Sequence, residues 1–184
     1  MQSLTGRGYV FIGMDHFAKP DDELSIALKE GWLQRNFQGY STYADCDLVA
    51  IGVSSIGKIG STYAQNERDI DTYYAAIDEG RLPIMRGYQL NQDDLLRRNI
   101  IQDLMCRFSL DFQIYESVFG IPFHQYFADE LADLQNLAEL GLLRLKPHGL
   151  TVTPKGRFLI RNIAMVFDYH LRHKETTAKY SQTV

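Results

Sequence analysis

The sequence predicts an α+β protein in which a strand-rich first part is followed by a mostly helical second part. Residues 1–89 contain short apolar runs, glycines and polar loops, whereas helical periodicity dominates residues 90–184. The charge changes at the same place, because residues 1–89 carry 12 acidic and 8 basic side chains and residues 90–184 carry 11 of each. We therefore expect two domains, 1–89 and 90–184.

The composition excludes several classes of protein. With 184 residues, 45% of them hydrophobic and 23% charged, the chain is neither disordered nor collagen-like nor a disulfide framework. Its net charge of −4 lacks the basic surplus of a protein held on nucleic-acid phosphates. No apolar run approaches the roughly 18 residues of a membrane span, and the start of the chain lacks a signal-peptide core. We expect a cytoplasmic protein with no membrane or nucleic-acid partner.

In the first part, two apolar runs predict buried strands over residues 9–14 and 47–53. Their continuous apolar character is typical of parallel or mixed sheets, and two such strands are too few to complete a sheet of that kind. Asp21 is placed to cap a short helix that ends near Gly31.

A second short helix is predicted over residues 67–79, with Gly80 just after its end, and residues 85–89 are expected to be extended. Its apolar side chains recur every three or four residues: Ile70, Tyr73, Tyr74 and Ile77.

In the second part, Asn91 is expected to cap a helix over 92–107, and a shorter helix should cover 111–119. Pro122 opens a third helix, which Gly141 ends. Alternating apolar residues on either side of the turn 147–149 predict a β-hairpin.

Thr153 followed by Pro154 predicts the start of a final helix. Its inward-facing residues should be Phe158, Leu159, Ile163, Val166, Phe167 and Leu171, and the polar tail 174–184 should fray. This order of three helices, a hairpin and a helix is close to that of a winged-helix domain.

A free-standing winged-helix-like interaction module is therefore one functional alternative. A nucleic-acid-binding version would need a basic recognition helix. The helix from residue 122 to 140 carries no Lys or Arg, and its charged residues are Asp129, Glu130, Asp133 and Glu139. Because such a face repels phosphate, nucleic-acid binding is disfavoured.

Metal-binding patterns are sparse. Cys46 and Cys106 belong to no CxxC pattern, and we interpret them as reduced, mostly buried thiols. His170 and His173 have ligand-like spacing, but histidines near a helix end more often interact with the helix dipole. An iron–sulfur cluster requires three or four thiolates, which this sequence does not contain.

Three other groups are candidates for ligand contacts. The small residues of 52–60 follow the second predicted strand, and they indicate either close backbone approach to a ligand or a tight exit from the strand. Asp15 and His16 directly follow the first strand, where open sheets place functional groups. Arg157 and Arg161 lie four residues apart and form either an anion-binding pair or a solvated stripe.

Five separated motifs are more specific. They are Ile-Gly-Met-Asp-His-Phe-Ala-Lys-Pro at 12–20, Asn-Phe-Gln-Gly-Tyr at 36–40, Gly-Val-Ser-Ser-Ile at 52–56, Tyr-Ala-Gln-Asn at 63–66, and Thr-Pro-Lys-Gly-Arg-Phe-Leu-Ile-Arg-Asn-Ile at 153–163. In order and spacing they resemble the oxygen-independent coproporphyrinogen III oxidases (dehydrogenases). The resemblance extends from Gly8 to the tail and concerns the C-terminal part of that family.

The resemblance implies a radical S-adenosylmethionine (SAM) enzyme of haem biosynthesis, in which a 5′-deoxyadenosyl radical initiates oxidative decarboxylation of two propionates of coproporphyrinogen III, giving protoporphyrinogen IX. It implies that residues 1–89 are the terminal strands of an incomplete (β/α) barrel and that residues 90–184 are a helical C-terminal domain. The family's three-cysteine motif for a [4Fe–4S] cluster lies in the other part of the barrel, which would be the partner of this chain. We expect the 184 residues alone to be inactive.

The resemblance also implies two site residues. The glutamine of Asn-Phe-Gln-Gly-Tyr and the isoleucine that ends Gly-Val-Ser-Ser-Ile line a pocket beside a SAM molecule in the family. These positions are Gln38 and Ile56, an amide for polar contacts and an apolar wall. No cluster ligand and no catalytic residue can be transferred to this chain.

Overall fold

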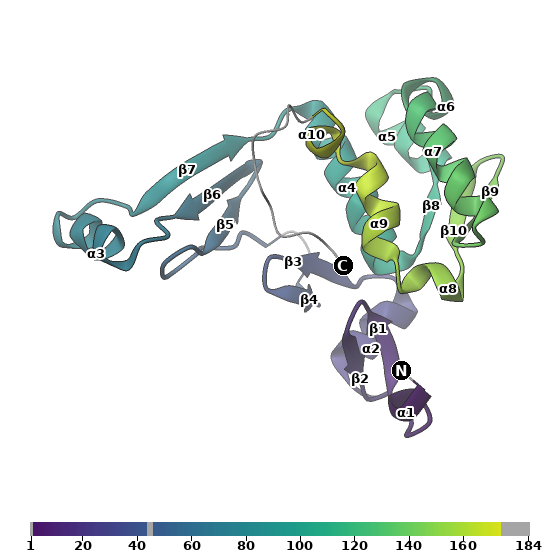
Figure 1. Ribbon diagram of the computed structural model, residues 1–184, viewed down its shortest axis with the longest axis horizontal. Helices are drawn as coiled ribbons and strands as arrows, with labels where there is room; N and C mark the ends of the chain where they lie inside the picture. The colour runs from purple at the N-terminus through teal and green to yellow at the C-terminus, as the bar shows by residue number, and fades with distance from the viewer. Residues whose placement is uncertain (1, 44–45, 174–184) are drawn as a thin grey trace. The chain divides into compact units, whose positions relative to one another are not determined.

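The structure is a computed structural model that describes residues 2–43 and 46–173. Helices and antiparallel strands alternate along the chain (Figure 1). Two compact units are present, one up to Arg98 and one from Asn99 onward, and the boundary falls within helix α4 (Gln92–Arg107). The mixed helix and strand content of the prediction is confirmed.

The first unit begins with a short helix, α1 (Gln2–Thr5), and a hairpin of β1 (Val10–Gly13) and β2 (His16–Ala18). The predicted strand at 9–14 is therefore present, but its partner is the antiparallel strand that follows it. Helix α2 (Glu23–Glu30) is capped by Asp22, one residue later than predicted, because its carboxylate accepts the Leu24 N–H at 2.9 Å.

Two further antiparallel sheets complete the first unit. The hairpin of β3 (Gln34–Asn36) and β4 (Gly39–Ser41) forms one. The other has the strand order β5–β6–β7, with β5 at Ile56–Ile59, β6 at Thr62–Asn66 and β7 at Ile84–Gln89. Helix α3 (Ile70–Asp78) connects β6 to β7 and lies at one end of this sheet in Figure 1. No strand pair in the described residues is parallel.

The prediction of a buried strand at 47–53 was wrong. This segment makes only an isolated bridge between Leu48 and Lys58, and the side chains of Val49 and Ile51 are 70% and 86% exposed. The backbone leaves the extended conformation immediately afterwards, since Gly52 and Ser54 have φ of 98° and 58°. The apolar run is therefore an exposed segment beside β5.

Helix α3 is shorter than its predicted range of 67–79, because Asp69 caps it. The Asp69 carboxylate accepts the backbone N–H and the hydroxyl of Thr72, and these hydrogen bonds lower the pKa of Asp69. Most of the apolar side chains at this spacing are exposed. Ile70, Tyr74 and Ile77 are 54%, 57% and 45% exposed, and Ala76 is the buried residue of the helix.

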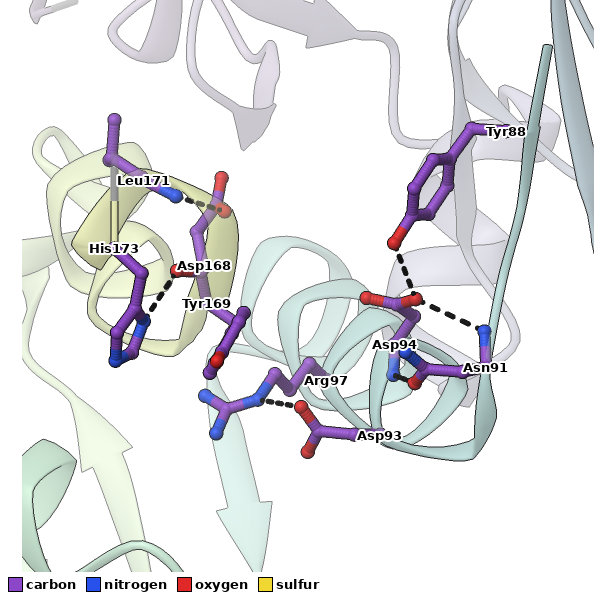
Figure 2. A network of polar contacts seen from close by, with 9 residues as sticks. All are labelled: Tyr88, Asn91, Asp93, Asp94, Arg97, Asp168, Tyr169, Leu171 and His173. Atoms are coloured by element: carbon purple, nitrogen blue, oxygen red, sulfur yellow. Dashed lines mark hydrogen bonds and ion pairs between the residues drawn. The ribbon is translucent and has the colours of Figure 1, made fainter. Parts of the chain in front are cut away.

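The predicted cap of α4 is confirmed (Figure 2). Asn91 Oδ1 accepts the Asp94 N–H at 2.9 Å, and Asp94 Oδ2 accepts the Asn91 N–H at 3.0 Å. The Tyr88 hydroxyl at the end of β7 also donates to Asp94 Oδ2, at 3.0 Å. This side-chain network therefore fixes the point at which β7 passes into α4.

The second unit continues with a strand that the sequence did not predict, β8 (Ser109–Asp111), and with α5 (Phe112–Phe119). The predicted hairpin is confirmed as β9 (Leu143–Lys146) and β10 (Gly149–Val152), and β8 adds to it in the order β8–β10–β9. A strand of three residues carries too little alternation for detection from sequence.

Two predicted helices are interrupted. The helix expected from Pro122 to Gly141 is divided at Phe127, with φ −109° and ψ 35°, into α6 (Phe123–Tyr126) and α7 (Ala128–Glu139). Thr153 and Pro154 start the last helical region as predicted, since Thr153 Oγ1 accepts the Gly156 N–H at 3.1 Å. That region is a series of short helices: α8 (Pro154–Arg157), α9 (Ile160–Ala164), the 3-10 helix η1 (Met165–Phe167) and α10 (Tyr169–Arg172).

Because these helices change direction, only part of the predicted inward face is buried. Ile163 and Phe167 are fully buried, whereas Phe158, Leu159 and Leu171 are exposed. The tail 174–184 lies outside the described residues. Four phenylalanines form the centre of this unit: Phe112, Phe123, Phe127 and Phe167. The rings of Phe112 and Phe123 are stacked with their centroids 4.1 Å apart.

A buried tyrosine joins α5 to α4 within the second unit. Tyr115 is 4% exposed, and its hydroxyl donates to Asp103 Oδ2 at 2.7 Å. Burial raises the pKa of Tyr115, and the neighbouring Asp103 carboxylate raises it further. The neutral phenol is therefore the form that the folded state favours.

We expect Tyr115→Phe to lower the free energy of unfolding at pH 7 by about 1.5–3 kcal/mol, the usual contribution of a hydrogen bond to a charged group. The raised pKa makes this contribution fully present below the unfolded pKa of about 10 and progressively lost above it. The difference between parent and variant should then shrink by about 1.4 kcal/mol per pH unit. Urea unfolding at several pH values measures it, and a constant difference up to pH 11 would contradict the assignment.

Candidate functional site

The turn of the β3–β4 hairpin holds Gln38. Asn36 Oδ1 accepts the Gln38 N–H at 2.8 Å, and Gly39 follows with φ 127°, a conformation that favours glycine. The backbone at Gln38 is therefore fixed. Its side chain is exposed, and among the described residues its amide has no hydrogen-bond partner.

Asp15 and His16 lie beside this turn. His16 Nδ1 is 2.8 Å from Asp15 Oδ1, and the imidazole meets the Tyr40 ring edge-on with the centroids 5.2 Å apart. A Cβ atom at Gly39 would lie 3.4 Å from His16 Nε2, so the glycine gives the histidine room against the turn. The fold thus brings the predicted Asp15–His16 pair next to the segment that carries Gln38.

An aromatic contact joins the same turn to the β5–β6–β7 sheet. The rings of Phe37 and Tyr63 are T-shaped, with centroids 5.3 Å apart. Tyr63 and Gln65 are two residues apart on β6 and share one face of the sheet, and Ile56 on β5 is directly opposite Gln65. The turn at Gln38 therefore contacts the sheet face that carries Ile56.

Two buried amides hold the loop that leads to Ile56. Asn66 Nδ2 donates to the carbonyl oxygens of Ala50 and Gly52, at 3.3 and 3.0 Å, and Gln65 Nε2 donates to that of Ser54 at 3.1 Å. Both side chains are below 10% exposure. Sequence reasoning missed this role, although both residues lie in the Tyr-Ala-Gln-Asn motif; the signal was two successive amides at the end of a short strand.

The small residues of 52–60 serve backbone packing at one position. A Cβ atom at Gly57 would lie 2.8 Å from the Leu48 carbonyl oxygen, so only glycine allows the exposed segment beside β5 to approach this closely. At Gly57 the structure therefore favours the second alternative, in which a small residue allows tight packing of the backbone rather than contact with a ligand.

Other predicted candidates are not brought together. Arg157 and Arg161 lie in separate helices, α8 and α9, and the Arg157 guanidinium lies over the Phe108 ring at 4.5 Å. His173 Nδ1 bonds to the Tyr169 carbonyl oxygen at 2.9 Å (Figure 2). Cys46 is exposed, against expectation, and Cys106 is buried. The described residues contain no group of three His, Cys, Asp or Glu side chains that could hold a metal ion.

Within the ranges 2–43 and 46–173, no helix has both the length and the apolar character needed to cross a lipid bilayer.

Comparison with known proteins gives consistent results. A family model described as the HemN C-terminal domain matches residues 90–159. The oxygen-independent coproporphyrinogen III oxidases of Salmonella typhimurium and Synechocystis are 49% and 50% identical over 99% and 98% of this chain, and each match covers 40% of the relative. The structure of coproporphyrinogen III oxidase (HemN) from Escherichia coli, described as a radical SAM enzyme, superposes with a TM-score of 0.87 at 49% identity, over 91% of this chain and 39% of that one. The chain thus spans about 40% of the length of these relatives.

Proposed function

The chain matches the C-terminal part of the oxygen-independent coproporphyrinogen III oxidase family, and we propose that it forms that part of such an enzyme. The reaction is the oxidative decarboxylation of two propionates of coproporphyrinogen III to give protoporphyrinogen IX. The observation that carries the proposal is the identity of about half of all residues over nearly the whole chain, combined with the TM-score of 0.87. A cytoplasmic location stays a prediction.

Within that enzyme, residues 1–89 supply the end of the barrel domain and residues 90–184 the helical C-terminal domain. The order α4, β8, α5, α7, β9, β10 supports a winged-helix-like arrangement for the second domain. Helix α7 carries three acidic residues within Ala128–Asp133 and no Lys or Arg, so it does not support nucleic-acid binding.

The exposed apolar side chains of the first unit support a partner in the part of the relatives that this chain does not match. They lie on α3 and on the segment that leads into β7: Ile70, Tyr74, Ile77, Leu82 and Ile84, each 44–78% exposed. Apolar groups gathered in this way are more typical of a surface that another part of the protein covers than of a solvated one.

The two cofactors differ in their fit to this chain. The sequence has two cysteines, and no described cluster of side chains suits a metal ion, so the [4Fe–4S] cluster does not fit these residues. SAM fits better, since Gln38 offers an exposed amide without a partner in the described residues and Ile56 is a half-buried apolar side chain on the adjoining sheet face. When bound, the cofactor supplies the radical chemistry.

We assign Gln38 the role of a hydrogen-bonding group beside SAM and Ile56 the role of an apolar wall. The hydrogen bond from the Gln38 N–H to Asn36 fixes the backbone from which the Gln38 side chain extends. The hydrogen bonds from Gln65 and Asn66 to carbonyl oxygens in 50–54 fix the backbone that leads to Ile56. The protein's contribution at this site is therefore positioning and exclusion of water.

The 184-residue chain alone should form no 5′-deoxyadenosine in an anaerobic assay with reductant and SAM, because it has no thiolate set for the cluster. A chimera in which this chain replaces the matching 40% of the Escherichia coli relative should convert coproporphyrinogen III to protoporphyrinogen IX. The Escherichia coli enzyme with the same part deleted is the control. An inactive but folded chimera with full iron content would argue against the proposed function.

A further inference from the structure

Two arginines converge on one amide oxygen beside the candidate site. Gln65 Oε1 accepts the Arg86 Nε–H at 2.9 Å and lies 3.5 Å from Arg68 Nη2. The orientation of this amide is fixed, because its nitrogen donates to the Ser54 carbonyl oxygen at 3.1 Å and the side chain is only 9% exposed. The Gln65 side chain is thus fixed in orientation, and its oxygen contacts both guanidinium groups.

Arg86 lies on the sheet face that carries Ile56, and Arg68 approaches that face at Gln65. Arg86 on β7, Gln65 on β6 and Ile56 on β5 are directly opposite one another in register and therefore share a face of the sheet. With strands about 4.8 Å apart, Arg86 and Ile56 are about 10 Å from each other.

The charge on this face is unbalanced. Its strand positions include two cations and no carboxylate: Ile56, Lys58, Tyr63, Gln65, Arg86 and Tyr88. Arg68 and Arg86 are exposed, and within residues 2–43 and 46–173 neither forms an ion pair. Two like charges that meet at a neutral oxygen repel each other, and an anion placed between them removes that repulsion.

We infer that Arg86 and Arg68 bind a carboxylate of a ligand that lies against Ile56 and Gln38. Because Nε of Arg86 is held by Gln65, the edge formed by its two Nη atoms is left for a bidentate contact, the geometry that suits a carboxylate. The inference rests on the proposed function, which offers two sources of this chemistry: a propionate of the tetrapyrrole substrate and the α-carboxylate of SAM.

The primary test is equilibrium binding to the 184-residue chain, with coproporphyrin III followed by fluorescence and SAM by calorimetry. Arg86→Gln and Arg68→Gln should each weaken the binding of one of these acids about five- to tenfold. Arg81→Gln is the matched control, because Arg81 is an exposed arginine of the same unit that pairs with Glu79 instead. Thermal unfolding checks that all three variants keep the fold.

Two analogues identify the source of the carboxylate. If the arginines bind a propionate, the variants weaken binding of coproporphyrin III and leave the affinity for its tetramethyl ester unchanged. If they bind SAM, the variants weaken binding of SAM and leave the affinity for decarboxylated SAM unchanged. Unchanged affinity for both acids in both variants would overturn the inference.

The chimera separates this inference from the proposed function. Where the isolated chain binds neither acid, the KM values of the active chimera for coproporphyrinogen III and SAM decide the matter. If the chimera is active and its two KM values are unaffected by Arg86→Gln and Arg68→Gln, the inference about the two arginines is wrong and the proposed function stands. A folded, inactive chimera, together with no binding by the isolated chain, overturns both.

Discussion

Replacing Gly156 with alanine should destabilise the second unit by more than about 3 kcal/mol, beyond the common range for overpacking. A Cβ atom at Gly156 would lie 1.8 Å from the Leu142 carbonyl oxygen and 2.8 Å from its carbon. That carbonyl cannot move easily, because it accepts hydrogen bonds from the Thr153 N–H at 2.9 Å and from the Thr153 hydroxyl at 3.1 Å. The same threonine caps α8, so relief of the clash would break the cap as well.

The steric clash and the helix propensity of alanine predict opposite changes in the free energy of unfolding, so the experiment distinguishes them. Helix propensity alone would favour alanine over glycine within α8 by about 1 kcal/mol. Urea unfolding of the full chain measures the change, and Asn162→Ala, an exposed position on the neighbouring α9, is the control. An unfolding free energy that rises or stays constant in Gly156→Ala would show that the close approach of Leu142 to α8 is absent in solution.

Features that depend on neighbouring residues were predicted well from the sequence. Asn91 and Thr153 cap the helices that they were expected to cap, and the hairpin around 147–149 forms in the expected place. Each depends on a side chain and backbone groups within three or four residues, or on a tight turn. Their information is therefore contained in the local sequence.

Features that depend on distant partners were predicted poorly. The segment at 47–53 is as apolar as a buried strand but makes only the Leu48–Lys58 bridge, and its Val49 and Ile51 side chains are exposed. Apolar character shows what a segment is able to bury and does not identify what covers it. The break at Phe127 is likewise not visible in a regular spacing of apolar residues.

In the candidate site, too, the features that depend on distant partners were the ones that the sequence did not predict. Gln38 and Ile56 came from the family resemblance, and the structure adds how their backbones are held. The bonds of Gln65 and Asn66 to the 50–54 loop were not predicted, because the two successive amides do not show which loop lies beside β6. The convergence of Arg68 and Arg86 on Gln65 depends on the pairing of β6 with β7, across an intervening helix, and was equally hidden.

In the active chimera, Gln38→Ala should weaken the use of SAM by roughly 5- to 150-fold, which corresponds to the loss of about 1–3 kcal/mol from one hydrogen bond to a ligand. The structure sharpens this expectation. Since the Gln38 amide has no partner among the described residues, its removal should leave the melting temperature unchanged. Gln135→Ala, an exposed glutamine on α7 in the second unit, is the matched control and should change neither property.

Ile56→Ala should behave differently from Gln38→Ala, because Ile56 is half-buried on β5 and contributes both to the sheet and to the proposed apolar wall. We expect weaker SAM binding together with a loss of stability, at about 0.8 kcal/mol per buried methylene removed. KM for SAM, iron content and melting temperature are measured together for all three variants. If Gln38→Ala loses turnover only in proportion to iron content and melting temperature, its amide serves the fold, and the assignment of Gln38 to the ligand is wrong.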